Sequence, residues 1–111
     1  MEITDYRIHT GSSAEKFFKS TLFQSPHLLL GLNCLEAGQT QAPHQHAGQD
    51  KFYFVLEGEG EFTVGRETSR GKPGSAIWAP AGAIHGVANN GTERLVLLVG
   101  IAPAPAKAQA R

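Results

Sequence analysis

The sequence predicts an all-β, single-domain barrel, and three observations carry this prediction. Short runs rich in Val, Leu and Phe recur along the chain, separated by many of its 13 Gly and 6 Pro residues, the pattern of short strands joined by turns. The 111 residues, 41% hydrophobic, suffice for one core and are too few for two domains of usual size. Several runs are apolar on both faces, which indicates strands buried between a barrel interior and a second covered surface.

Six runs are the clearest strand candidates, and each ends at or near a Gly, Pro or Asn turn signal. They cover residues 27–36, 51–57, 60–65, 75–79, 85–89 and 93–101. Because the second covered surface is either another sheet or a partner subunit, we expect a homodimer.

One short helix is predicted over residues 13–19, because Ser12 and Glu15 form a capping-box pattern ahead of Phe17 and Phe18. Three turns are predicted between strands. Residues 72–75 suit a type II turn, residues 58–60 a tight reversal, and residues 90–91, an Asn-Gly pair, a type I′ hairpin.

Charge and composition exclude several classes of partner. Ten Lys and Arg residues balance ten Asp and Glu residues, so there is no basic field to attract nucleic acid or an anionic membrane surface. The longest apolar stretch starts at Leu95, is too short to span a bilayer and is interrupted by Pro103. The single Cys34 cannot form an internal disulfide, and the N-terminus lacks a signal-peptide pattern, so we expect a cytoplasmic protein.

Two histidines provide the first indication of a metal site. His44 and His46 are two residues apart, so in an extended strand they point to one face with Cα atoms about 6.6 Å apart. Imidazole binds Zn, Cu, Fe and Ni, and a pair at this spacing forms half a site. His85 follows a turn at the start of a predicted strand, where it could meet the pair across the barrel.

The spacing around these histidines resembles the two motifs of the cupin family. The first motif runs from Gly38 through His44 and His46 to Gly58, and the second from Gly74 to Asn89. In the second, Pro80, Gly82 and His85 stand at the matching positions, and a 15-residue gap separates the motifs. The resemblance implies a double-stranded β-helix, or jelly-roll barrel. Residues 38–101 would form the core barrel, residues 1–37 its N-terminal strands and helix, and residues 102–111 a mobile Ala/Pro tail.

The same resemblance implies one divalent transition-metal ion, which the sequence does not distinguish among Fe, Mn, Ni, Zn and Cu. Its ligands would be His44, His46 and His85. It also implies a small-molecule ligand in the barrel, oxygen-rich or aromatic. Dioxygenase-like or isomerase-like catalysis, a non-catalytic binding or sensor role, and a metal-free structural dimer all remain open.

The sequence departs from the family pattern at one position. Lys51 stands where a Glu is the usual fourth ligand, and an ammonium has no lone pair to offer a cation. Asp50, the amide oxygen of Gln49, or water could complete the site instead, with Asp50 ranked slightly first because a carboxylate would offset the charge of the ion. Alternatively, the excess charge favours an anionic ligand that Lys51 would pair with. Tyr53 shares strand parity with Lys51 and is the second predicted pocket residue.

Overall fold

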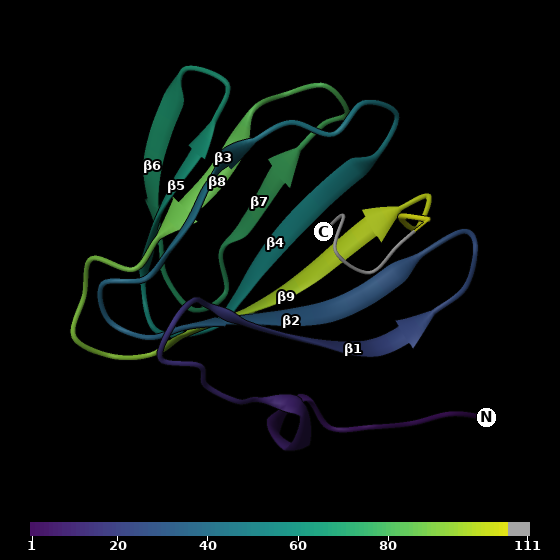
Figure 1. The fold of residues 1–111 in the computed structure, drawn as a ribbon, viewed down its shortest axis with the longest axis horizontal. Coiled ribbons are helices and arrows are strands. Elements are labelled where there is room, and N and C mark those ends of the chain that lie inside the picture. Colours follow the sequence, from purple (N-terminus) through teal and green to yellow (C-terminus); the bar gives the residue numbers. More distant parts are fainter. Residues whose placement is uncertain (107–111) are drawn as a thin grey trace.

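The fold is two antiparallel β-sheets packed face to face, and the all-β prediction is confirmed (Figure 1). The computed structural model describes residues 1–106. The five-stranded sheet has the order β1 (Phe18–Gln24), β2 (Leu29–Leu35), β9 (Leu95–Ala102), β4 (Asp50–Glu57), β7 (Ala76–Ala79). The four-stranded sheet has the order β3 (Thr40–His44), β8 (His85–Ala88), β5 (Gly60–Val64), β6 (Glu67–Gly71).

The barrel interior is filled by alternating residues of both sheets. One continuous cluster packs there, with Tyr53, Phe62, Val87 and Leu97 among its members. The residues between them on β2, β4 and β9 face outward, where Leu32, Cys34 and Val96 form a second cluster. Both faces of β9 are therefore buried, as its continuous apolar sequence predicts.

The N-terminal segment lies against the outside of the five-stranded sheet (Figure 1). It contains a short 3-10 helix, η1 (Tyr6–His9), and the Tyr6 ring packs on the outer cluster while its hydroxyl donates to Glu57 at 2.8 Å. Asp5 caps η1 by accepting a hydrogen bond from the Arg7 backbone N–H. This segment covers part of the surface that would otherwise need a second sheet or subunit.

The helix predicted over residues 13–19 is wrong. Ser13 to Phe17 form no helix, and Phe18 opens β1. The physical reason is that Phe17 packs against the interior cluster while its neighbour Phe18 packs against the outer cluster. Neighbouring side chains on opposite faces are a feature of extended backbone, and burying both rings outweighs the weak local capping signal.

One predicted turn agrees with the structure and another does not. Gly74 has a φ of 95° and the Ser75 N–H donates to Lys72 C=O at 2.8 Å, which agrees with the type II turn. The type I′ hairpin at Asn90-Gly91 is wrong, because neither residue has a positive φ. This segment connects β8 in one sheet to β9 in the other rather than joining two paired strands.

The last described residues follow β9 and contact the segment between β1 and β2. β9 finishes at Ala102, Pro105 is buried, and the Ala104 N–H donates to Pro26 C=O at 3.3 Å. Of the predicted Ala/Pro tail over residues 102–111, residues 107–111 lie outside the described part of the chain. Among residues 1–106, no helix is long and apolar enough to cross a membrane.

Candidate metal centre

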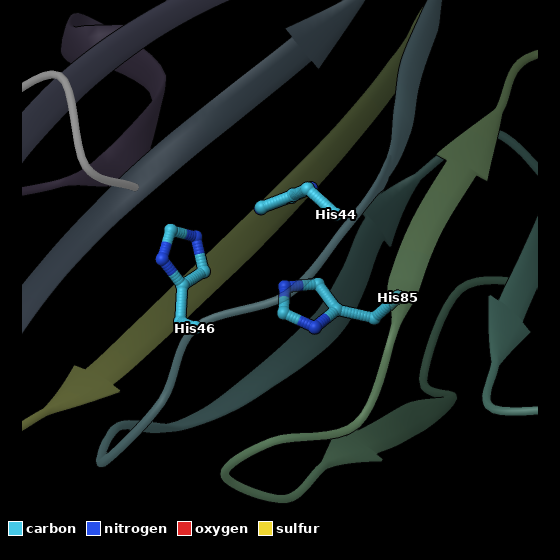
Figure 2. A group of neighbouring side chains, drawn as sticks. All are labelled: His44, His46 and His85. Carbon is cyan, nitrogen blue, oxygen red and sulfur yellow. The ribbon is translucent and has the colours of Figure 1, made fainter.

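Three histidines converge at one end of the barrel (Figure 2). His44, the last residue of β3, lies opposite His85, the first residue of β8. His46 follows two residues after β3, in a loop tied to the turn after β7: the Gly82 N–H donates to His46 C=O at 3.0 Å, and Gln45 Nε2 donates to Gly82 C=O at 2.7 Å. Ring centroids lie 4.4 Å apart for His44 and His85, and 4.6 Å for His44 and His46.

Gly86 lets the two histidine-bearing strands approach each other. A Cβ at this position would lie 2.7 Å from the Gln41 carbonyl oxygen and 2.9 Å from the Pro43 nitrogen, both backbone atoms of β3. Only glycine fits there without moving the strand that carries His44.

The ring nitrogens meet the main requirement of a metal site. One nitrogen from each histidine lies within 4.8 Å of the others, so the three form a group that could hold one metal ion. His44 Nδ1 lies 3.0 Å from Ala42 C=O and His85 Nδ1 lies 3.1 Å from Ala83 C=O. Backbone acceptors of this kind hold the proton on Nδ1 and leave the Nε2 lone pair for a metal.

Two of these nitrogens are buried without a partner. Nε2 of His46 and Nε2 of His85 are shielded from solvent and make no hydrogen bond among residues 1–106. A buried unpaired polar atom costs about 1–3 kcal/mol. A divalent ion would satisfy both atoms, so the residues present fit the metal that such a cluster implies.

The electrostatics keep the three rings neutral, the form that binds metal. Burial lowers the pKa of His85 to about 4, and the charge of Lys51 acts in the same direction. Burial also lowers the pKa of His44 and of His46, again with a contribution from Lys51. Near pH 7 these side chains are acceptors that need no proton release before an ion binds.

Of the three residues considered for a fourth ligand, only Lys51 is directed into the barrel. Asp50 is exposed, and its Oδ1 accepts a hydrogen bond from the Ala81 backbone N–H at 2.9 Å. Gln49 donates to Pro103 C=O at 3.2 Å. The geometric group contains His44, His46 and His85 and does not include Asp50.

Lys51 lies in the interior beside Tyr53. Its side chain is 2% exposed, its Nζ lies 4.6 Å from the centre of the Tyr53 ring, and it donates to Gln41 Oε1 at 3.4 Å. Tyr53 is fully buried, its hydroxyl also donates to Gln41 Oε1, and burial raises its pKa, so the phenol stays protonated. The structure thus brings both predicted pocket residues into one polar group.

Gln41 is the residue that sequence reasoning missed. Simple alternation along β3 places it on the opposite face from His44, three residues later. An extra residue between Gln41 and His44 shifts the register against β8, so both side chains face the interior. A Pro at position 43, inside a strand, is the only signal in the sequence of such an irregularity.

A comparison with protein families matches residues 31–101 to the cupin domain model. The chain is a cupin. A solved structure of the protein TT1209 from Thermus thermophilus superposes with a TM-score of 0.91 and is 45% identical, covering 95% of this cupin and 100% of that chain. A predicted oxalate decarboxylase from Thermotoga maritima gives a TM-score of 0.72 at 25% identity, covering 76% of this chain and 77% of the other.

A curated relative extends the comparison by sequence. The uncharacterized protein SCO3923 of Streptomyces coelicolor is 42% identical over 59 residues, which are 53% of this chain and 55% of that protein. The match thus spans about half the length of that relative. These likenesses confirm the family and the barrel.

Proposed function

We propose that this cupin binds one divalent transition-metal ion through His44, His46 and His85 and uses it to hold a small oxygen-rich or aromatic metabolite in the barrel. The observation that carries the proposal is the pair of buried Nε2 atoms without partners, in a group of neutral rings whose ligand nitrogens lie within 4.8 Å of one another. Three protein ligands leave coordination positions open, the arrangement of metal sites that act on a substrate.

The remaining residues of the site would orient the ligand and limit water. A bound ion supplies Lewis-acid polarisation of a ligand oxygen. Gln41, whose oxygen accepts from Tyr53, would form part of the wall around the ligand, and Val64 and Ile101 lie beside His85 and Lys51 in the strand registers. Dioxygenase-like or isomerase-like turnover is the catalytic form of this proposal.

A non-catalytic role as a small-molecule binder or sensor is the second candidate. One observation favours it: within the described residues, no carboxylate joins the histidine group, and a carboxylate is a frequent general base. Tyr53, protonated and bonded to Gln41, is a poor base. The ligand would then be bound without being converted.

Metal content tests the proposal directly. The protein, purified without a metal-affinity step, is expected to contain about one equivalent of transition metal, and the His85→Ala variant far less. Metal well below one equivalent that is unchanged by His85→Ala would rule the site out. Oxygen consumption or substrate turnover that stops on chelation would support an enzyme, whereas tight ligand binding without turnover would support a sensor.

The homodimer and the cytoplasmic location stay predictions. The outer face of the five-stranded sheet retains apolar side chains that the N-terminal segment does not cover, among them Trp78, which is 58% exposed. Sedimentation velocity of the parent protein and of Trp78→Glu tests the dimer, since a charge on a buried interface would shift the equilibrium to monomer.

A further inference from the structure

Asn33 is a buried polar residue whose side chain makes no hydrogen bond. It lies in β2 and is 0% exposed, and neither its Oδ1 nor its Nδ2 has a partner among residues 1–106. The large majority of buried side-chain polar atoms in folded proteins are paired, because an unpaired one lowers stability. The amide therefore holds an unused acceptor and an unused donor side by side.

The strand registers direct the Asn33 side chain into the barrel. Residues directly opposite each other in antiparallel strands lie on one face of the sheet, and Asn33 lies opposite Leu97, a member of the interior cluster. On its other side β2 pairs with β1, where Lys19 lies opposite Asn33 (Figure 1). The charge of Lys19 lowers the pKa of His44, so this row of the sheet lies within electrostatic reach of the candidate metal centre.

The next row of the same sheet connects Asn33 with the histidine end. Gly31, the next interior position of β2, has no side chain and lies opposite Val99. Val99 lies opposite Tyr53 of β4, whose ring centre is 6.2 Å from that of His85. Two residues along a strand span about 6.6 Å. About one row of side chains thus separates the amide from the nearest histidine ring.

The surroundings of the amide restrict what can pair with it. Its neighbours on the interior face, Leu35, Leu97 and Val99, are buried and apolar. A ligand with many hydroxyl groups would leave most of them unpaired against these side chains, which is costly. A ligand that offers one N–H and one C=O side by side on an apolar body would satisfy both atoms of Asn33 and bury no further polar group.

We infer that the metabolite of this site carries an amide, either a primary carboxamide or a ring amide, on an otherwise apolar body. Asn33 binds that amide edge to edge, and an oxygen at the other end of the molecule meets the ion held by the histidines. This inference rests on the proposed function and names the class of ligand. Asn33 is then a residue that determines specificity and is separate from the metal ligands.

Two small aromatic molecules are matched probes for this inference. 4-Hydroxybenzamide and 4-hydroxyacetophenone both carry a phenol oxygen for the ion and differ only in an NH2 group against a CH3 group. Calorimetric titration of the zinc-loaded protein should show 4-hydroxybenzamide binding at least about tenfold tighter, because the methyl group leaves Oδ1 of Asn33 without a donor. In Asn33→Leu the preference should fall to about twofold or less with zinc content unchanged. Asn90→Leu, at an exposed asparagine before β9, should behave as the parent.

Stability separates ligand binding from a structural role of the amide. Leu has the same branched arrangement of heavy atoms as Asn and no polar atom to bury, so metal-free Asn33→Leu should unfold at the same or a higher urea concentration than the parent. Asn33→Val is smaller and suits a strand, so it should lose the probe preference in the same way even if Leu is too large for the space. A lower urea midpoint in both variants would mark the amide as structural and overturn the inference.

Zinc content distinguishes the two ways in which the experiment can fail. If the parent binds zinc without preferring 4-hydroxybenzamide, or if the preference survives in both Asn33 variants, the inference is wrong while the metal site stands. If the parent binds no zinc, the proposed function fails, and the inference that rests on it fails as well.

Discussion

Buried polar side-chain atoms are hydrogen-bonded at one end of the barrel interior and lack partners at the other. At one end, Asn89 is fully buried and every side-chain atom is bonded: Nδ2 donates to Leu35 C=O at 2.8 Å and Glu93 C=O at 2.9 Å, and Oδ1 accepts from the Gly91 N–H at 3.0 Å. At the other end, Nε2 of His46 and of His85 are buried and have no partner among the described residues. We call the Asn89 end, where the side-chain hydrogen bonds are complete, the closed end of the barrel. We call the histidine end, where two ring nitrogens lack a partner, the open end.

This difference separates a structural polar residue from a functional one. Asn89 stands at a fixed position of the second motif, and its contacts show that it ties the end of β8 to the end of β2 and to the segment before β9. The histidines stand in the same two motifs, yet their unpaired nitrogens reduce stability until a ligand arrives. Substitutions at the Asn89 end should therefore lower the free energy of unfolding, and substitutions at the histidine end should lower metal affinity.

The largest effect is expected at the closed end. Asn89→Ala removes three hydrogen bonds, one of them to the carbonyl of the buried Leu35, which should lower the free energy of unfolding by about 3 kcal/mol in urea titrations. Asn90→Ala, at the exposed neighbouring residue, should change it by less than about 0.5 kcal/mol. Equal losses in both variants would show that the Asn89 contacts do not stabilise the fold.

The open end should respond in metal affinity instead of stability. His46→Ala is expected to weaken metal binding by about 100-fold, or about 2.8 kcal/mol, in chelator competition. The metal-free variant should unfold within about 1 kcal/mol of the parent, because the lost nitrogen had no partner. His27→Ala, at an exposed histidine outside the group, is the matched control. Parent-like affinity in His46→Ala would remove this residue from the site.

The sequence predicts the closed end and the barrel better than it predicts the open end. Apolar runs locate β2, β4, β5, β7, β8 and β9, because burial on one or both faces marks these strands in the composition. β6 (Glu67–Gly71) has four exposed residues of five, and β3 (Thr40–His44) contains a proline, which edge strands tolerate. Neither has a hydrophobic signal, so neither is among the strand candidates.

Motif spacing and strand parity predict part of the candidate site from the sequence. Spacing identifies the three histidines, and strand parity pairs Tyr53 with Lys51. It does not decide among Gln49, Asp50 and Lys51, because the direction of a side chain depends on where β4 begins. The structure starts β4 at Asp50 and pairs Lys51 with Ile101, which turns the lysine inward. The position of Gln41 could not be predicted from the sequence, because the irregularity in β3 reverses the face of the strand on which its side chain lies.

Acid should lower the stability of the metal-free protein, because His85 at the open end is folded in its neutral form. The folded pKa of His85 is about 4 and the unfolded value about 6.5, so between these limits the unfolded chain binds the proton that the folded chain excludes. Stability is thus fully present above pH 6.5 and is lost as the pH falls towards 4, by about 2 kcal/mol between about pH 6.5 and pH 4.5. Urea titrations across this range should show the loss in the parent, and a flatter profile in His85→Gln. A parent profile as flat as that of His85→Gln would contradict the assignment.

The smallest effect is expected for Asp50, at the rim of the open end. Substitutions there test whether its carboxylate is a surface contact or a metal ligand. Its carboxylate is exposed and bonded to the Ala81 N–H, so Asp50→Ala should cost about 0.5–1 kcal/mol of stability, the size of one hydrogen bond at the surface. Metal affinity should change by less than threefold, because the ion is held by the three histidines. Asp50→Asn retains an oxygen for Ala81 and should recover most of the stability. A loss of metal comparable to that in His46→Ala would instead make Asp50 the fourth ligand.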